Sequence, residues 1–577
     1  MERIIWKRRS TVVLAGMLAV LLFGAYHAMS HNNQSKPWTD AHQPVDRRVN
    51  ELVEHMTFDD KLALLQGVGQ ESGVSGYVGH INANPRLKIP SINLEDGAQG
   101  IGDNVPGVTA LPAPISLSAS WDHSDAVLYG TLLGREASGK GVNVLLGPNV
   151  NIMRTALNGR TFESYGEDPY LNAEMGTSVI DGIQSQHVIA VVKHFVANNQ
   201  ETDRTSENDH IDQRTLHEIY LLPFEAAVKD GNVGAVMAAY NQVNGQYMTD
   251  NRSLLTGVLD DSWGFKGFVV SDWGATHNTF QAIQAGLDMN MPGGKNQPDY
   301  FGVPLRKAVV SGQISISTIN NDVRRILRPL FDVGAFNQAP EGNLQKKVTN
   351  SSDDREAQKI EEDGTVLLKD TGGILPLENV HTIAVIGQSA SENPMISGGG
   401  SAHVNASSVV TPFEGIKQRA GSSIRVLYSP GTLPIPTGPT FINSPNWFPV
   451  IPGQLFGKGI QTQYFQSTDL SGTPVETRSS DIDFSWTKKP VPQITSSGWS
   501  AKWIGRVTPP TSGTYTFGLS SSGGSRLYIN GKIVLDRWNK GMTQSTCTAI
   551  ATAGHPCLSN SITLRMALRH HPTRCCH

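Results

Sequence analysis

Short apolar runs alternate with longer amphipathic segments between residues 89 and 330 of this chain. The apolar runs are rich in β-branched residues, which predicts strands at 89–94, 142–146, 188–192, 234–238 and 267–270. Helical periodicity predicts helices at 125–138, 171–185, 213–229, 280–287 and 320–330, and one earlier helix at 44–65. Because alternating strands and helices build parallel sheets, this pattern predicts a (β/α)8-type barrel.

Charged and aromatic residues follow the predicted strands. Catalytic groups of barrel enzymes lie at the carboxyl ends of the strands, so we expect these residues to share one site. Sugar hydroxyls need charge-assisted hydrogen bonds, and an aromatic ring can pack against the C–H face of a sugar. Each residue taken singly could instead form a structural ion pair or cap a helix. The residues are Asp96, Arg160, Lys193, His194, Tyr240, Asp272 and Trp273.

The strand at 267–270 delivers a carboxylate and an indole side by side, in Asp272 and Trp273. A carboxylate in that place can attack the anomeric carbon of a sugar. Aspartate also favours the position just before a helix, so Asp272 could instead cap the helix that follows. This short stretch by itself leaves both interpretations open.

Five motifs, in this order along the chain, resemble glycoside hydrolase family 3, the β-glucosidase-like enzymes. They are Lys193-His194-Phe195, Asn198-Asn199-Gln200-Glu201, Arg214-Thr215-Leu216, Met237-Ala238-Ala239-Tyr240-Asn241 and Ser271-Asp272-Trp273. The resemblance extends over about residues 40 to 450. It implies that Asp272 is the nucleophile of a retaining mechanism. It also implies a sugar subsite lined by Asp96, Arg160, Lys193, His194 and Tyr240, with Trp273 beside it, and neither a metal nor a cofactor.

One loop departs from the pattern of that family. Its Asp-Gly-Pro-x-Gly-x-Arg sequence stands here as Asp96-Gly97-Ala98-Gln99-Gly100-Ile101-Gly102, so the arginine is absent. Substrate contacts near Asp96 therefore follow less directly from the resemblance than those elsewhere in the site.

The chain changes character after the barrel, so we expect a multidomain α/β protein. Residues 31–335 are assigned to the barrel, and 336–453 to a partial second α/β sandwich domain. Residues 454–546 are assigned to an all-β sandwich that resembles the PA-14 domain, where Asn530-Gly531 predicts a tight hairpin. In the family such an insert shapes the aglycone side of the site; a sugar-binding module and a packed spacer are the alternatives.

The two ends of the chain are unusual. Basic residues precede a short apolar run from Val12 to Tyr26, which predicts a signal peptide at 1–30, with an uncleaved anchor as the alternative. All four cysteines lie in 547–577, and no acidic residue follows Asp536. We interpret 547–577 as an aberrant tail on a truncated chain. A disulfide or metal cluster is the alternative, although the spacing fits no metal template.

A retaining glycosidase needs a second carboxyl as its acid/base, and the sequence leaves that residue unknown. Asp209-His210 could supply a dyad, but its spacing from Lys193 does not fit. The expected function is a secreted or periplasmic, exo-acting β-glycosidase that binds a β-linked oligosaccharide or glycoside. The alternative is a truncated, catalytically impaired chain that still binds sugar. A net charge of −4 without a basic tract argues against nucleic-acid partners, and cleavage would leave no stable membrane span.

Overall fold

The computed structural model describes residues 36–293, 298–431, 447–448 and most of 460–570. The gaps in the last stretch are 480–488, 497, 508–512, 522–523, 539–542 and 552–561. The chain divides into two compact units, one of residues 1–380 with 395–410 and one of 381–394 with 411–577. The expected signal peptide lies outside the described residues. No helix among the described residues is both long enough and apolar enough to cross a membrane.

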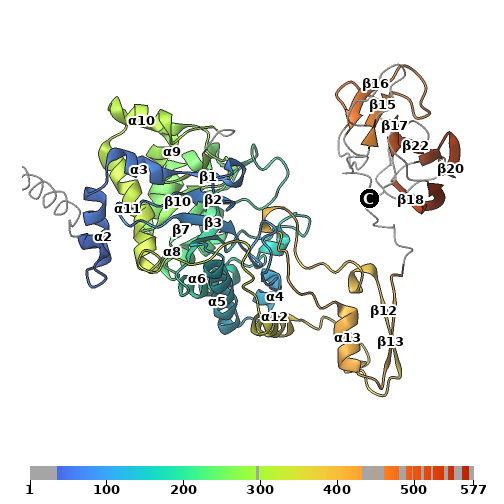
Figure 1. Cartoon of the computed structure of the whole chain (residues 1–577), viewed down its shortest axis with the longest axis horizontal. Helices are drawn as coiled ribbons and strands as arrows, with labels where there is room; N and C mark the ends of the chain where they lie inside the picture. The colour runs from blue at the N-terminus through green and yellow to red at the C-terminus, as the bar shows by residue number, and fades with distance from the viewer. Residues whose placement is uncertain are drawn as a thin grey trace, which may run out of the picture. The chain divides into compact units, whose positions relative to one another are not determined.

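An eight-stranded sheet forms the centre of the first unit, with the strand order β10-β7-β5-β4-β3-β2-β1-β11 (Figure 1). The backbone N–H of Ser271 donates to the carbonyl of Met289 at 2.9 Å, so the two end strands meet and the sheet closes. The barrel expected from the alternating pattern is therefore confirmed. Its strands are β1 (Gln66–Gly69), β2 (Gly79–Ile81), β3 (Ile92–Asp96), β4 (Val144–Leu146), β5 (Ile189–Phe195), β7 (Ala235–Ala238), β10 (Phe268–Ser271) and β11 (Asn290–Gly293).

Three of these strands, β1, β2 and β11, were not predicted from the sequence. They are short, and β1 has the sequence Gln-Gly-Val-Gly, which carries little apolar signal. Strand β2 runs antiparallel to both β1 and β3, so the barrel departs from an all-parallel ring. Gly67 is needed in β1 because a Cβ there would lie 2.2 Å from the Cε of Met291.

Helices surround the barrel, largely where the periodicity predicts them (Figure 1). The single helix expected at 44–65 is wrong, because the chain breaks at residues 55–57. Thr57 begins the second helix there by accepting a hydrogen bond from the Asp60 N–H, while Asp60 accepts one from the Thr57 N–H. The helices are α2 (Val45–Glu54), α3 (Phe58–Leu65), α4 (Pro114–Ala119), α5 (His123–Gly139), α6 (Pro169–Gln184), α7 (Gln213–Thr215), α8 (Leu222–Lys229), α9 (Thr279–Ala285), α10 (Val303–Val310), α11 (Ile316–Asp332) and α12 (Ser351–Gly364).

The second unit begins with a parallel pair of strands, β12 (Thr382–Ile386) and β13 (Arg425–Ser429), beside helix α13 (Pro412–Ala420). Strand β12 has the largely apolar sequence Thr-Ile-Ala-Val-Ile, yet Val385 is its one buried residue and Ile386 is 68% exposed. Among the described residues this sheet has two strands, which are too few to bury both faces of β12.

An antiparallel β domain occupies the rest of this unit. Its main sheet has the order β16-β15-β17-β22-β19-β20, with β14 beside β17, and β18 pairs with β21. The hairpin expected at Asn530-Gly531 is confirmed, because both residues have positive φ, 49° and 81°. The strands are β14 (Trp447–Phe448), β15 (Ile460–Phe465), β16 (Val475–Ser479), β17 (Trp499–Val507), β18 (Gly513–Ser521), β19 (Gly524–Ile529), β20 (Lys532–Asp536), β21 (Thr543–Ala551) and β22 (Ile562–His570).

The structure corrects the domain boundary expected at residue 546. Strand β22 comes from the segment interpreted as an aberrant tail, yet it pairs with both β17 and β19 inside the main sheet. Its sequence, Ile-Thr-Leu-Arg-Met-Ala-Leu-Arg-His, alternates apolar and polar residues with the period of a strand. The unusual composition of the tail concealed this local pattern.

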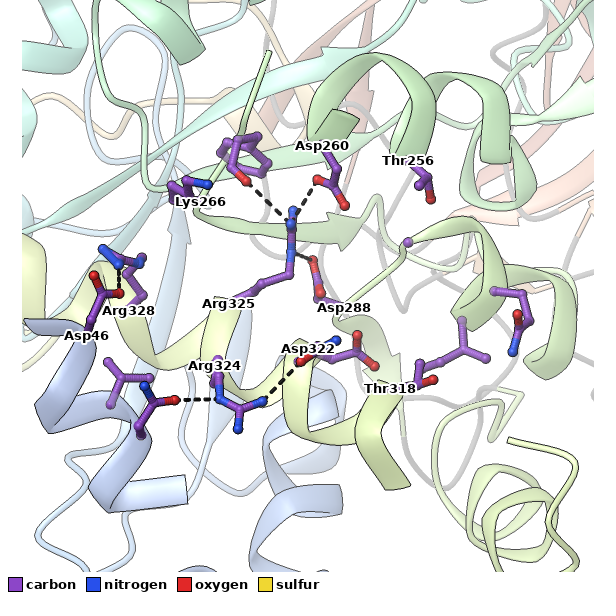
Figure 2. Close-up of a pocket in the computed structure, with 17 residues that line it drawn as sticks. Asp46, Thr256, Asp260, Lys266, Asp288, Thr318, Asp322, Arg324, Arg325 and Arg328 are labelled. Carbon is purple, nitrogen blue, oxygen red and sulfur yellow. Dashed lines mark hydrogen bonds and ion pairs between the residues drawn. The ribbon is translucent and has the colours of Figure 1, made fainter. Parts of the chain in front are cut away.

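A pocket of about 650 Å³ opens at the amino ends of the barrel strands, away from the predicted site (Figure 2). Residues that line this pocket form ion pairs with one another. Arg325 of α11 lies 2.8 Å from the Asp260 carboxylate and 3.1 Å from that of Asp288, and Asp288 also accepts from the Val269 N–H of β10. Burial and the charge of Asp288 hold the pKa of Asp322 well above its usual value. We infer that this pocket is part of the structural framework.

Replacing Asp322 with asparagine is expected to raise the melting temperature at pH 7 and to leave it nearly unchanged at pH 4. The buried carboxyl of Asp322 binds its proton more tightly in the folded chain than in the unfolded chain. Stability is therefore lost as pH rises above about 4 towards the higher folded pKa. An amide donates to Asp288 at every pH and removes that loss. Thermal unfolding at the two pH values tests this, and an Asp322→Asn variant that is less stable at both would contradict it.

Candidate active site

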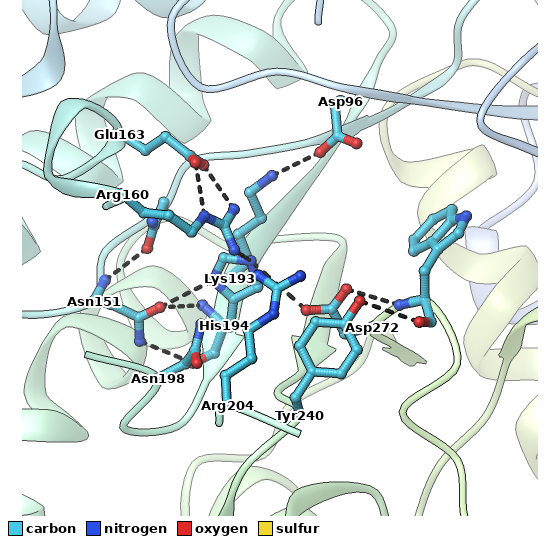
Figure 3. Close-up of polar contacts among 12 residues, drawn as sticks. Asp96, Asn151, Arg160, Glu163, Lys193, His194, Asn198, Arg204, Tyr240 and Asp272 are labelled. Carbon is cyan, nitrogen blue, oxygen red and sulfur yellow. Dashed lines mark hydrogen bonds and ion pairs between the residues drawn. The ribbon is translucent and has the colours of Figure 1, made fainter. Parts of the chain in front are cut away.

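The predicted site residues meet at the carboxyl ends of five barrel strands (Figure 3). The structure brings all of them together through a linked set of contacts. Asp96 ends β3, Arg160 follows β4, and Lys193 and His194 lie near the end of β5. Tyr240 follows β7, and Asp272 with Trp273 follows β10.

Asp272 is 7% exposed and holds its carboxylate among hydrogen-bond donors and cations. The Trp273 N–H donates to Oδ1 at 2.7 Å, whereas Oδ2 forms no hydrogen bond of normal geometry with any described residue. Burial raises the pKa of Asp272, and the positive charge of Arg160 is the strongest opposing influence. Helix α9 is capped by Asn278, whose side chain accepts from the Gln281 N–H, so the capping interpretation of Asp272 is wrong.

Lys193 and Asp96 form a buried ion pair, with 3.0 Å between Nζ and Oδ1. Lys193 is 1% exposed. Two further carboxyls lie nearby. Burial, followed by the charge of Asp103, raises the pKa of Glu95 well above its usual value, and burial followed by the charge of Asp96 raises that of Asp103 to about 7. Lys193 therefore faces a cluster of buried carboxyls whose pKa values are shifted towards the protonated form.

The contacts of the His194 ring suit a neutral imidazole, with Nε2 near a guanidinium donor and Nδ1 near an amide oxygen. Burial lowers its pKa well below the usual value, and the positive charges of Arg160 and Lys193 lower it further. Nε2 of His194 lies 3.0 Å from a guanidinium nitrogen of Arg160 and 3.8 Å from Oδ2 of Asp272. Because Arg160 always donates, Nε2 must accept, and the longer contact with Asp272 is not an ion pair. Arg160 is itself fixed by two hydrogen bonds to the carboxylate of Glu163, at 2.7 and 2.9 Å.

Sequence reasoning missed three residues of this site, namely Asn151, Glu163 and Arg204. The Arg204 guanidinium lies 4.6 Å from the centre of the Tyr240 ring and 2.7 Å from the Glu201 carboxylate. Its charge also lowers the pKa of Asp272. The only signal in the sequence is its place three residues after Glu201, in the loop that follows β5.

The loop that lacks the family arginine is covered by the returning segment 395–410 of the same unit. A Cβ on Gly102 would lie 2.3 Å from the carbonyl oxygen of Ser401, so any side chain there would displace that segment. The Asp103 N–H donates to the same carbonyl at 2.7 Å, and the Gln99 amide donates to the Ile396 carbonyl at 2.9 Å. The departure from the family pattern thus coincides with close packing over Asp96.

The dyad considered at Asp209-His210 does not form among the described residues. Asp209 accepts a hydrogen bond from the Asn241 amide at 2.8 Å, and His210 contacts the amide of Asn208 at 3.2 Å. The groups that act most strongly on the Asp272 pKa are cations and hydrogen-bond donors rather than a second carboxyl. The acid/base residue remains unassigned.

Two family models match the chain. Residues 62–329 match the glycosyl hydrolase family 3 N-terminal domain, and residues 458–567 match the PA14 domain. The first match coincides with the barrel. The second extends past residue 546 and includes most of β22, in agreement with the corrected domain boundary.

Relatives of known name are β-glucosidases. The chain is 37% identical over 505 residues to a β-glucosidase of Rhizobium radiobacter, covering 85% of this chain and 58% of that protein. It is also 37% identical over 400 residues to the thermostable β-glucosidase B of Acetivibrio thermocellus, covering 66% of this chain and 50% of that protein. The crystal structure of a Kluyveromyces marxianus β-glucosidase in complex with glucose superimposes with a TM-score of 0.63 at 28% identity, covering 90% of this chain and 63% of that one. The chain thus spans about half to three fifths of the length of these relatives.

Proposed function

The chain belongs to glycosyl hydrolase family 3, and on that premise we propose that it is a β-glucosidase-like glycoside hydrolase. Its substrate is a β-linked oligosaccharide or glycoside, and it acts by a retaining, exo-acting mechanism. The observation that carries the proposal is the Asp272 carboxylate. It lies at the end of a barrel strand among cations, with one oxygen that makes no hydrogen bond to the described residues.

A retaining mechanism uses Asp272 twice. Its free Oδ2 attacks the anomeric carbon as the glycosidic bond breaks, and the departing oxygen takes a proton from an acid that we do not assign. Water then attacks the same carbon from the opposite face to Asp272 and releases the carboxylate, so that the configuration is retained overall. The positive charges of Arg160 and Arg204 favour the ionised carboxylate that the first step requires.

The polar residues around Asp272 suit a single sugar ring. The Asp96 carboxylate, the Lys193 ammonium and the Arg160 guanidinium can each bind a hydroxyl with a charge-assisted hydrogen bond. Half-buried Trp273 offers an indole, which its Nε1–H fixes in place by donating to the Val78 carbonyl at 3.1 Å. The loop over Asp96 packs against segment 395–410, and we expect this packing to limit the site to a terminal sugar.

We also propose that the protein is exported and acts in the periplasm or outside the cell. The support is the basic N-terminus followed by a short apolar run ending near Tyr26, with Ala28-Met29-Ser30 as the cleavage site. Sequencing the N-terminus of the protein recovered from its native compartment would test this. A mature chain that begins at His31 is expected, and an intact Met1 would contradict the proposal.

The test of the catalytic proposal is covalent labelling with 2,4-dinitrophenyl 2-deoxy-2-fluoro-β-glucoside. The fluorine slows both steps, and dinitrophenolate departs without a proton, so the experiment does not depend on the unassigned acid. One peptide, the one containing Asp272, is expected to gain the mass of one fluoroglucosyl group. Labelling of another carboxylate would overturn the assignment of the nucleophile, and the absence of any labelling would overturn the retaining mechanism.

A further inference from the structure

The Asn151 side chain forms hydrogen bonds with the backbone N–H, the backbone carbonyl and the ring of His194, although 43 positions separate the two residues. Its Oδ1 lies 2.9 Å from the His194 backbone N and 3.0 Å from ring Nδ1, and its Nδ2 donates to the His194 carbonyl at 2.9 Å. Figure 3 shows these contacts beside Asp272. Asn151 comes from the loop after β4, where its own N–H donates to the Asn149 side chain at 3.0 Å.

These contacts determine where the proton of the His194 ring lies. A backbone N–H can only donate and a carbonyl can only accept, so they fix which end of the Asn151 amide is oxygen. That oxygen also faces Nδ1, and therefore Nδ1 must carry the hydrogen. Nε2 then has only a lone pair, which accepts from Arg160 at 3.0 Å.

This arrangement has a consequence for the nucleophile. A proton on Nε2 would be drawn towards Oδ2 of Asp272, 3.8 Å away, and would repel the guanidinium of Arg160. A charged His194 would do both and would place a cation among three others. The charged groups that face the ring are Arg160 from the loop after β4, Lys193 of β5, Arg204 from the loop after β5, and Asp272 after β10.

We propose that Asn151 is a positioning residue that holds His194 as the neutral Nδ1–H tautomer, so that Nε2 orients Arg160 and Oδ2 of Asp272 stays free to attack. The proposal rests on the catalytic role proposed for Asp272, since it names what keeps a His194 proton away from Oδ2. It concerns the ring of His194 directly, and this makes it measurable without turnover.

The first test is ¹⁵N NMR of the full chain with labelled histidine, with the His194 signals identified by their loss in His194→Gln. In the wild-type protein at pH 7 the ring is expected to show a protonated Nδ1, facing Oδ1 of Asn151, and an unprotonated Nε2, which accepts from Arg160. An Nε2–H tautomer or a charged ring at pH 7 would overturn the proposal. This measurement requires neither hydrolysis of a substrate nor labelling of Asp272. The proposal for Asn151 and the proposal for Asp272 can therefore be contradicted independently.

The second test compares two substitutions at residue 151. Asn151→Asp places a carboxylate against Nδ1 and raises the pKa of His194, so the ring becomes charged as pH falls. We expect kcat/KM on aryl glucosides to be about 10- to 100-fold lower at pH 6 and less reduced at pH 8. Asn151→Ala removes the group that fixes the tautomer of His194 but adds no charge. The loss of kcat/KM in this variant should therefore not increase as pH falls.

A matched control is Asn172→Ala, which removes another buried asparagine that donates to two backbone carbonyls, those of Gly166 and Asp168. This control should leave both the His194 signals and the pH profile unchanged. If the His194 ring of Asn151→Asp becomes charged as pH falls and kcat/KM shows no acid limb, the protonation of His194 does not affect Asp272 and the proposal is wrong. A variant that fails to fold still leaves the wild-type tautomer as the deciding measurement.

Discussion

Replacing Asp272 with alanine is expected to lower kcat on dinitrophenyl glucosides by about 10³-fold or more, because covalent catalysis is lost. Azide should restore turnover, because a small anion can occupy the space of the carboxylate and attack the same carbon. The expected product is the α-glucosyl azide, formed with inversion, and NMR analysis of the product identifies it. A purely structural loss would be neither rescued by azide nor accompanied by a change in stereochemistry.

A control for this experiment is Asp250→Asn. Asp250 is also a partly buried carboxyl, which accepts from the Asn278 amide at 2.8 Å, and burial raises its pKa to about 6. It contacts none of the proposed site residues, so this variant should retain activity. An Asp272→Ala chain that keeps more than about a tenth of wild-type kcat would contradict covalent catalysis by that residue.

Lys193→Met is expected to destabilise the barrel by about 3–5 kcal/mol, because it leaves the Asp96 carboxylate buried without its partner. Asp96→Asn should cost less, although it breaks the same ion pair. Burial and the charge of Asp96 raise the pKa of Asp103 to about 7, so Asp103 loses its proton more readily when the charge of Asp96 is removed. Asp103 would then balance the lysine in place of Asp96.

Urea unfolding of the barrel transition at pH 7 measures both single variants and the double variant. The double variant should recover part of the stability lost in Lys193→Met, because neither buried charge remains. Lys229→Met, which removes an exposed lysine of α8 paired with the partly exposed Glu225, serves as a control with little expected change. Equal losses in Asp96→Asn and Lys193→Met would show that Asp103 does not take over the charge.

Local patterns in the sequence were sufficient for much of the fold. The strands β4, β5, β7 and β10 carry runs of apolar side chains on both faces, and β3 begins with an apolar stretch, so the signal is visible within a few residues. The polar residues directly after them could be named because the carboxyl ends of barrel strands converge. The hairpin at Asn530-Gly531 followed equally from local chemistry, since both positions need positive φ.

Tertiary structure decided what depends on residues far apart in the chain. Closure of the barrel uses β1, β2 and β11, which are too short and too rich in glycine or polar residues to signal a strand by themselves. His194 is held by Asn151, 43 positions away, and the buried ammonium of Lys193 is paired with Asp96, 97 positions away. Periodicity in the sequence indicates which face of a strand or helix is buried. The tautomer of a histidine ring instead depends on the atoms that contact it, and these come from distant parts of the chain.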